Sequence, residues 1–353
     1  MSDIDRRALV LAAIAGLTSH TAGAARTVRD SAGRAVTLAD RIAKVMAAGP
    51  PASVVIYSLA PDKLAGWQRA PNAEEKVYLL PSTRDLPVLG RLTGRGDTAN
   101  VEIVLKARPD LVVDFGSLTP TYVSLADATQ ERTGIPYALV DGRFHATPEA
   151  LRLLGDMLGV RDRAERLARY AEDLFGRIDA TLAGVPERQR PAVYLARGPL
   201  GLETGLRGSI NAEIIERAGG RNVAEAEDGR RGIANVSPEQ ILLWRPEVII
   251  TWDRNFFRNL SERPDEEWRS LPAVANRRVY LAPTAPFGWI DGPPSVNRLI
   301  GLAWLAHVFH GERFPFDVAR DARAFYKLFY QVDVTDRDLA VLFAPAAPGA
   351  SAR

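Results

Sequence analysis

The chain contains one sequence element twice, and this duplication limits the folds that it can adopt. Residues 101–114 read VEIVLKARPDLVVD, and residues 238–251 read PEQILLWRPEVIIT. Each copy combines a short apolar helix pattern, an Arg-Pro pair, an acidic residue and a β-branched strand pattern. The proline ends the helix because it cannot continue the helical hydrogen bonding. A further strand pattern follows each copy, at 137–140 and 279–281, so we predict two related α/β lobes with a ligand cleft between them.

The length and composition of the chain agree with two lobes. A chain of 353 residues suggests about two domains of roughly 150 residues, each large enough for its own core. Hydrophobic residues make up 46% of the chain and charged residues 25%, as in ordinary globular proteins. The formal net charge is only +2 and the arginines are interleaved with acids, so the sequence carries no basic stripe for nucleic acid.

Residues 1–24 have the three regions of a secretory signal peptide. Arg6 and Arg7 precede an apolar run at 8–17, and Ala-Gly-Ala at 22–24 offers a cleavage site. The run is too short to span a bilayer. The arginine pair fits the twin-arginine route as well as ordinary Sec export, and a retained amphipathic helix is a further alternative. Because the chain has no cysteine for a disulfide or a lipid anchor, we predict a free periplasmic protein and not a lipoprotein.

The rest of the chain divides into four predicted parts. An α/β lobe at 25–146 is followed by a helical connector at 147–185, a second α/β lobe at 186–343 and a disordered tail at 344–353. Apolar residues recur at helical spacing through the connector, with a break at 159–162. Its roughly 35 helical residues would span about 50 Å if straight. We therefore predict a rod between the lobes; a helix packed inside one lobe is the alternative.

Several motifs resemble the class III periplasmic substrate-binding proteins of ABC importers, the group that serves ferric siderophores, haem and cobalamin. They are TVRDSAGRAVTL at 27–38, LAPDKLAGW at 59–67, the duplicated element, and AGGRNV at 218–223. The resemblance covers residues 27 to about 330. It implies an α/β fold of two Rossmann-like lobes joined by a single long backbone helix, with a shallow ligand cleft that closes little.

The resemblance also implies a function. The protein would be a monomeric binding protein, with no catalytic residue and no cofactor, that captures a ferric siderophore and delivers it to an inner-membrane ABC permease. A motif at 287–299 resembles a branch that includes iron, haem and molybdate binders, so haem, cobalamin and a molybdate-type oxyanion are alternative ligands. The permease would dock on one surface glutamate of each lobe: Glu216 on the second, and Glu74 or Glu75 on the first. A solvated acidic face is the alternative for these residues.

Ligand-contacting residues are expected where strands end and loops cross to the helices. Arginine offers an anionic chelate a charged fork and a stackable plane, and tryptophan offers a wide rigid surface. An oxyanion would need arginine and backbone N–H groups but little aromatic surface, so the aromatic residues favour a larger organic chelate. Core packing of the tryptophans and pairing of Arg197 and Arg254 with nearby acids are the alternatives. The predicted ligand-binding residues are Pro51, Arg91, Ser117, Arg197, Trp252, Arg254, Phe287 and Trp289.

The sequence favours neither a metal centre nor an enzyme. His307 and His310 share a helix, where a core or surface role is favoured over a metal site because no cysteine or third ligand is clustered with them. Residues 94–99 match G-x-G-x-x-A by letter, but Pro87 lies just upstream and no clear strand leads into them, so we predict a turn. A two-lobed nucleotide-sugar enzyme is the distant alternative. P-loop, nucleophile-elbow and zincin motifs are missing from the sequence.

Overall fold

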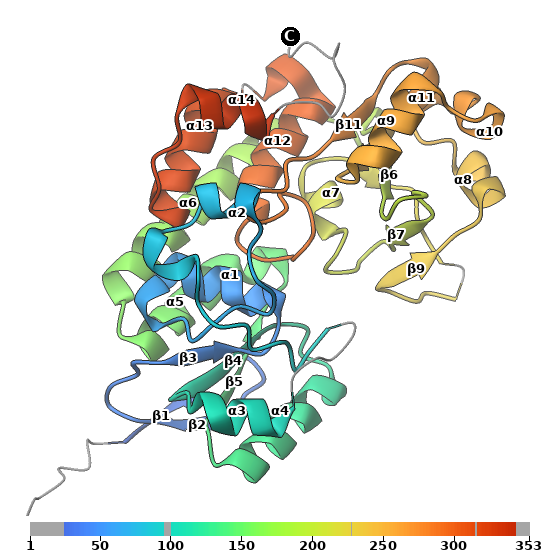
Figure 1. The fold of residues 1–353 in the computed structure, drawn as a ribbon. Helices are drawn as coiled ribbons and strands as arrows, with labels where there is room; N and C mark the ends of the chain where they lie inside the picture. The colour runs from blue at the N-terminus through green and yellow to red at the C-terminus, as the bar shows by residue number, and fades with distance from the viewer. Residues whose placement is uncertain (1–24, 95–99, 227, 315, 344–353) are drawn as a thin grey trace, which may run out of the picture.

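Two α/β lobes and a group of C-terminal helices make up the protein, as Figure 1 shows for the computed structural model. The residues that the structure describes are 25–94, 100–226, 228–314 and 316–343. The predicted signal peptide, the 95–99 part of the predicted turn and the predicted tail lie outside the described residues. Within the described residues, no helix has both the length and the apolar character needed to cross a membrane.

The first lobe is a three-layer α/β unit. Its elements are β1 (Arg26–Arg29), β2 (Ala35–Leu38), β3 (Val45–Ala47), α1 (Pro50–Leu59), α2 (Ala73–Val77), α3 (Val101–Ala107), β4 (Leu111–Gly116), α4 (Pro120–Thr133), β5 (Tyr137–Asp141) and α5 (Thr147–Leu158). The parallel sheet has the order β3-β4-β5, and β1 and β2 form the expected antiparallel hairpin. Because side chains alternate along a strand, Leu111 and Val113 join the core with α1 and α5, whereas Val112 joins the core with α3 and α4.

The second lobe repeats this plan. Its elements are β6 (Ala192–Ala196), β7 (Glu203–Gly205), α7 (Glu213–Arg217), β8 (Arg221–Asn222), β9 (Ile233–Asn235), α8 (Pro238–Trp244), β10 (Val248–Thr251), α9 (Arg254–Glu262), α10 (Glu266–Arg269), α11 (Pro272–Ala275), β11 (Val279–Leu281) and α12 (Arg298–His310). The parallel sheet has the order β11-β10-β6-β8, and β7 pairs with β9. Val248 and Ile250 face α7 and α12, and Ile249 faces α8, α9 and α11. The predicted two-lobed α/β fold is thus confirmed.

The two copies of the duplicated element fold alike, α3 with β4 in the first lobe and α8 with β10 in the second. Asn100 and Ser237 each cap their helix, because each side chain accepts a hydrogen bond from the backbone N–H three residues further on. Each helix ends at an arginine in the left-handed region, with φ of 45° at Arg108 and 46° at Arg245. A left-handed residue at this position turns the chain out of the helix just before the proline.

The acidic residue of each copy ties its strand to a neighbouring strand. Asp110 Oδ2 accepts hydrogen bonds from the backbone N–H groups of Ala43 (2.7 Å) and Lys44 (2.8 Å), just before β3. Glu247 Oε2 accepts one from the N–H of Ala192 (2.8 Å), the first residue of β6. Such bonds are charge-assisted and stronger than those between neutral groups. The repeated acid therefore helps to fix which residues of the parallel strands lie opposite each other.

The predicted connector is a helical hairpin and not a straight rod. Helix α5 ends at Gly159, which has a φ of 71°, and α6 (Arg161–Leu182) then runs back along it. Arg152 on α5 pairs with both Glu165 (2.8 Å) and Glu172 (2.6 Å) on α6, and Gly155 further along α5 lies against Ala164 nearer the start of α6, so the two helices are antiparallel. The sequence predicted the position of the break. The direction of the chain after the break depends on packing, because α5 lies in the core of the first lobe.

Helix α6 contacts both lobes. Near its start, Arg163 Nε donates to the carbonyl oxygen of Ser58 at the end of α1 (2.7 Å). Near its end, Arg217 of α7 pairs with Asp179, with 3.0 Å between Nη2 and Oδ2. Its 22 residues correspond to about 33 Å at 1.5 Å per residue, so α6 is shorter than the predicted rod.

The C-terminal helices return to the first lobe, although the sequence placed them in the second. They are α13 (Val318–Phe325), a π-helical turn (Tyr326–Tyr330) and α14 (Asp336–Leu342). Tyr57 Oη on α1 donates to the carbonyl oxygen of Tyr330 (2.9 Å), and Tyr78 Oη donates to that of Asp338 (2.8 Å). These helices lie beside α2 and α6 in Figure 1. The chain therefore passes between the lobes a second time.

Candidate functional site

A cavity of about 880 Å³ lies between the two lobes. The first lobe contributes the start of α1, the loop at 67–71 and the end of β4, and the second contributes Arg197 after β6 and the loop at 286–294. The carboxyl ends of both parallel sheets thus meet at the cavity, the usual position of a ligand in such lobes. The described lining side chains that are charged or aromatic are Trp67, Arg69, Glu75, Arg91, Asp114, Phe115, Tyr122, Arg197, Phe287 and Asp291.

The structure brings five of the eight predicted ligand-binding residues to this cavity. Pro51 and Arg91 line it from the first lobe together with Ser117, which follows β4. Arg197 and Phe287 line it from the second lobe. Pro51, Ser117, Arg197 and Phe287 follow a strand or begin a helix, as the rule that looks for residues at strand ends requires. Arg91 instead follows Val88, which forms an isolated β-bridge with Trp67.

The other three predicted residues lie outside the cavity wall. Trp289 is fully buried, and its Nε1 donates to Tyr326 Oη at 3.2 Å. Trp252 lies behind Arg197, with the guanidinium carbon 5.1 Å from the ring centroid. Arg254 pairs with Glu74 of the first lobe at 3.1 Å. The alternatives of core packing and of pairing with an acid therefore describe these residues, although the acid beside Arg254 is Glu74 and not its neighbour in sequence.

Arg197 is held in place by groups of the second lobe. Its Nε donates to Glu203 Oε1 at 2.9 Å, and its Nη1 pairs with Asp291. Asp291 also accepts hydrogen bonds from Asn211 Nδ2 (3.1 Å). With Trp252 behind it and only 15% of its side chain exposed, Arg197 presents a fixed guanidinium to the cavity. A cation that is already ordered loses little further freedom when an anion binds.

The first lobe supplies a second arginine that is anchored by an acid. Arg69 Nη1 donates to Glu75 Oε2 at 2.8 Å, and hydrogen bonding to Glu75 raises the pKa of Arg69. Glu75 in turn belongs to the capping box of α2, where it accepts from the N–H of Asn72 (2.9 Å). Together with Arg91, the lining therefore contains arginines from both lobes.

Aromatic side chains form a continuous group beside the cavity. Phe287 lies with its ring centroid 6.0 Å from those of Trp67 and Tyr57, and 5.5 Å from that of Tyr330. Trp67 is 4% exposed, and its Nε1 donates to the carbonyl oxygen of Thr83 at 2.7 Å. These spacings are typical of favourable edge and tilted contacts. The C-terminal helices thus support the aromatic wall of the cavity through Tyr330.

Asp114, near the end of β4, is a buried acid of the cavity wall. It is 6% exposed, and its carboxylate accepts from Thr93 Oγ1 (3.3 Å) and Tyr137 Oη (3.4 Å). Burial raises the pKa of Asp114 to about 6, and the hydrogen bonds from the two hydroxyls oppose that shift. An acid with this pKa changes its charge near neutral pH.

Asp114, Asp291, Trp67 and Arg69 are among the wall residues that were not predicted as ligand-binding. Asp114 lies three residues before the predicted Ser117, and a lone carboxylate in a β-branched strand was a usable signal. Asp291 follows the predicted Phe287 in the same loop. Trp67 and Arg69 belong to a connection that is not a strand end, so no positional rule pointed to them.

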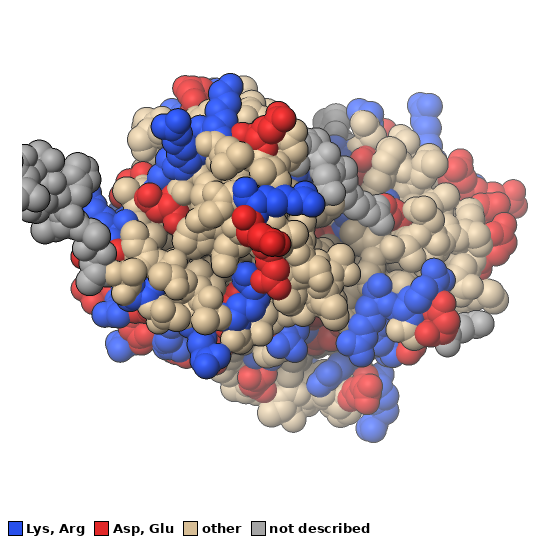
Figure 2. Space-filling model, turned by 90° about the horizontal axis from the view of Figure 1, so that it is seen from below, with Lys and Arg blue, Asp and Glu red and all other residues tan. Residues whose placement is uncertain are grey.

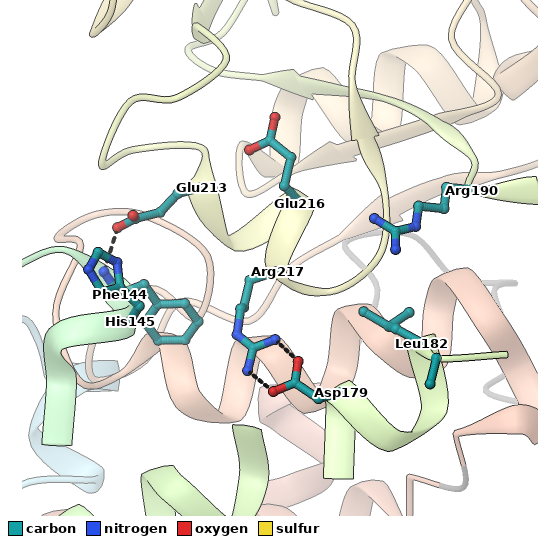
Figure 3. Close-up of a pocket in the computed structure, with 9 residues that line it drawn as sticks. Phe144, His145, Asp179, Leu182, Arg190, Glu213, Glu216 and Arg217 are labelled. Atoms are coloured by element: carbon teal, nitrogen blue, oxygen red, sulfur yellow. Dashed lines mark hydrogen bonds and ion pairs between the residues drawn. The ribbon is translucent and has the colours of Figure 1, made fainter. Parts of the chain in front are cut away.

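The three predicted docking glutamates have different surroundings. Glu74 is paired with Arg254, and Glu75 lines the cavity and pairs with Arg69. Glu216 lies on α7 beside a second cavity of about 540 Å³, and its side chain points away from the Arg217 ion pair (Figure 3). Burial raises the pKa of Glu216, whose Oε1 has no hydrogen-bond partner within the described part of the chain.

The possible metal ligands and the surface charges of the described residues were compared with the expectations from the sequence. Among the described residues, no three side chains of His, Cys, Asp or Glu gather as a metal site. His307 Nδ1 lies 3.3 Å from the carbonyl oxygen of Phe314, and His310 Nε2 lies 3.1 Å from that of Ala218. Acidic and basic side chains are interspersed over the face drawn in Figure 2.

Comparison with known proteins identifies the family. Residues 55–286 match the periplasmic binding protein family. The solved structure of an ABC transporter solute binding protein from Sulfurospirillum deleyianum is 31% identical, with a TM-score of 0.82, and the match covers 90% of this chain and 99% of that one. The chain therefore belongs to the periplasmic binding proteins, of class III, and is a solute-binding component of an ABC importer and not an enzyme.

Other similar proteins bind different ligands. The molybdate-binding protein MolA of Haemophilus influenzae is 24% identical over 92% of this chain and 96% of its own length. The structure of the periplasmic heme-binding protein RhuT from Roseiflexus is 20% identical with a TM-score of 0.57, and the match covers 76% of this chain and 98% of that one. Membership of the family thus fixes the role in transport and the periplasmic location, and leaves the ligand to be inferred from the cavity.

Proposed function

We propose that this periplasmic binding protein captures an anionic ferric chelate of the siderophore class between its lobes and delivers it to an inner-membrane permease. The observation that carries the proposal is the cavity wall, which combines arginines from both lobes with aromatic rings around about 880 Å³. Arginine suits the anionic oxygens of such a chelate, and the rings suit its flat organic faces.

The size of the cavity supports a chelate over a small ion. Cavities of roughly 300–1,000 Å³ are typical of sites for organic ligands. A tetrahedral oxyanion would occupy a small part of this volume and would leave Trp67 and Phe287 without a ligand surface. Phe287 is half-buried at the cavity, a position that an organic ring could cover.

A fluorescence titration of residues 25–353 tests the proposal. A ferric catecholate, a ferric hydroxamate, haemin, cobalamin and molybdate would be added separately to the protein. Submicromolar quenching by one of the two ferric siderophores is expected, and Trp67→Phe should reduce the quenching because Trp67 lines the cavity. Trp268→Phe, on α10, is the matched control and should leave the quenching unchanged. A response confined to haemin, cobalamin or molybdate would refute the siderophore ligand.

Molybdate is the second candidate ligand, because the similarity to MolA extends over nearly the whole of both chains. In that case the arginines of the cavity wall would hold the oxyanion, and the aromatic group would have a packing role only. Molybdate would then bind in the same titration while both ferric siderophores would not.

We further propose that Glu216 contacts the permease. The side chain is 35% exposed at the second cavity, and Arg207 Nε lies 3.9 Å from its Oε1. Glu216→Arg is expected to bind the chelate with unchanged affinity and to abolish uptake in cells, because it reverses the charge of the docking surface. Normal uptake by this variant would remove Glu216 from that surface.

We also propose that residues 1–24 are cleaved on export. N-terminal sequencing of protein from the periplasmic fraction should begin at Ala25. Replacing Arg6 and Arg7 by lysines separates the two routes, since twin-arginine export should fail and Sec export should continue. A mature protein that still starts at Met1 would contradict the proposal.

A further inference from the structure

Within the described part of the chain, three acidic side chains line the interlobe cavity, and two of them have a cation beside them. Glu75 pairs with Arg69, and Asp291 pairs with Arg197. Within the described residues, no lysine or arginine pairs with Asp114. The charges of the first two acids are therefore balanced locally, and the charge of Asp114 is not.

Because Asp114 lies in the cavity wall, its charge affects the binding of an anionic ligand. The residue is 6% exposed, lines the cavity, and among the described side chains accepts hydrogen bonds from the hydroxyls of Thr93 and Tyr137, while the backbone N–H of Phe115 also lowers its pKa. An ionised carboxylate there would be poorly solvated and would repel an anion in the same cavity. The neutral acid has an O–H that can donate to an anionic oxygen, while its carbonyl oxygen still accepts from a hydroxyl.

We propose that Asp114 contacts the bound anion as a neutral carboxylic acid, so that each binding event takes up one proton from solvent. The proposal rests on the proposed function, because it needs an anionic ligand. The proton adds to the Asp114 carboxylate, whose O–H then donates a hydrogen bond to the ligand. No other group has to gain or lose a proton.

The surroundings of Asp114 contain few other groups that can titrate. Tyr137 on β5 faces it directly, and burial raises the pKa of this hydroxyl, so it keeps its proton. Tyr122 on α4 and Arg34 in the β1–β2 turn act electrostatically on Tyr137, and Arg91 lines the same cavity. Because the raised pKa of Tyr137 keeps its hydroxyl protonated at neutral pH, Asp114 is the member of this hydrogen-bonded pair that changes charge.

The direction of the pH dependence follows from the free protein, in which burial raises the pKa of Asp114 to about 6. A bound anion raises this pKa further, because like charges disfavour ionisation. Below about pH 6 the acid is already protonated, and the affinity is level. Above it the affinity falls by about tenfold per pH unit until the pH reaches the pKa of the complex.

The test is isothermal titration calorimetry between pH 6.5 and 8.5, in buffers of different ionisation enthalpy, with a ferric tricatecholate and with molybdate as probes. The wild type is expected to take up most of one proton per bound anion near pH 7, above the pKa of Asp114 in the free protein and below its pKa in the complex. Asp114→Asn, whose amide can donate in place of the acid, is expected to bind without proton uptake and with an affinity that does not change with pH.

A second acid at the same edge of the sheet, Asp141, serves as the control that separates the effect of Asp114 from the effect of removing any nearby acid. Asp141 ends β5 outside the cavity lining, and although burial opposes the shift, hydrogen bonds from Arg143 lower its pKa overall. Asp141→Asn should therefore retain the proton uptake of the wild type. Tight binding to the wild type without proton uptake would overturn the role of Asp114 and leave the proposed function standing. Failure of both probes to bind at any pH would overturn the role of Asp114, and failure of the ferric hydroxamate as well in the fluorescence titration would overturn the proposed function.

Discussion

The two copies of the duplicated element share their scaffold and differ where the strand reaches the cavity. Both have a capped helix, a left-handed arginine, a proline and an acid that holds a neighbouring strand. At equivalent positions the first copy has Asp114 and the second has Thr251, whose Oγ1 accepts from the N–H of Asp253 (3.2 Å). The features needed to fold a parallel α/β lobe are therefore repeated, and the residue at this position of the strand, which lines the cavity only in the first copy, is not.

The lobes also differ in what they contribute to their junction. Arg298, at the start of α12 in the second lobe, is 1% exposed. Its Nη1 donates to the carbonyl oxygen of Ile210 (2.7 Å) and to Glu213 (2.9 Å), and its Nη2 donates to the carbonyl oxygen of Gly142 in the first lobe (2.9 Å). Glu213 also accepts from the N–H of Phe144, so one buried ion pair joins both lobes.

The largest expected effect is therefore at this junction. Arg298→Met should lower the free energy of unfolding by about 3–5 kcal/mol, because it leaves a half-buried carboxylate and two carbonyl groups without their donor. Urea unfolding measures the loss. Arg320→Met, at an exposed arginine of α13, is the control and should change the free energy of unfolding by less than about 0.5 kcal/mol. A loss below 1 kcal/mol for Arg298→Met would show that the junction does not depend on this arginine.

The next largest expected effect is on ligand affinity, and it differs between two arginines of the second lobe. Arg197→Ala should weaken the ferric chelate by about 1.5–3 kcal/mol, roughly 10- to 100-fold, because it removes an ordered cation from the cavity wall. Arg254→Ala should change the affinity by less than about threefold, since Arg254 lies outside the lining and makes an exposed ion pair with Glu74. Equal effects of the two substitutions in the titration would contradict the placement of the site.

A smaller effect on the free energy of unfolding is expected when the acid of each copy is replaced. Asp110→Ala should lower the free energy of unfolding by about 1–2 kcal/mol and Glu247→Ala by about half as much, because Asp110 accepts two backbone hydrogen bonds and Glu247 accepts one. Chemical denaturation of the two variants measures the two losses of unfolding free energy and hence their ratio. A greater loss in the Glu247 variant would mean that the two acids do not have the same role.

The smallest effect concerns the left-handed arginines. Arg108→Gly and Arg245→Gly should each raise the free energy of unfolding by about 0.5 kcal/mol, since relief of the left-handed strain outweighs the greater freedom of the unfolded chain. Thermal melts should show the same direction in both copies. If one substitution raised the melting temperature and the other lowered it, the two helix ends would not be equivalent.

The sequence predicted the parts of the fold that depend on local chemistry. The helix and strand of each copy of the duplicated element follow from proline and alternation, and the structure confirms them. Helix α5 also begins at Thr147, but its N-cap is Ala146 and no side chain caps it. The reversal after Gly159 and the return of the C-terminal helices did not follow, because both depend on contacts between residues far apart in the chain. A glycine at a helix end permits either a kink or a hairpin, and the packing of α5 decides between them.

For the candidate site, the sequence predicted positions better than orientations. Five of the eight predicted residues line the cavity, but Trp289 is buried in the core and Trp252 lies against Arg197. A pattern along the chain cannot show which side of a loop faces the cavity. Trp67 and Arg69 lie on the wall because the segment after α1 folds over it, which no local signal encodes.

The most direct test of a ferric chelate between the lobes is anomalous diffraction at the iron edge, from crystals grown with the siderophore that binds in the titration. One iron peak is expected in the interlobe cavity, within reach of Arg197 and Phe287 through the chelate. An iron peak elsewhere on the protein, or a cavity that remains without iron while the chelate binds in solution, would contradict the proposed site.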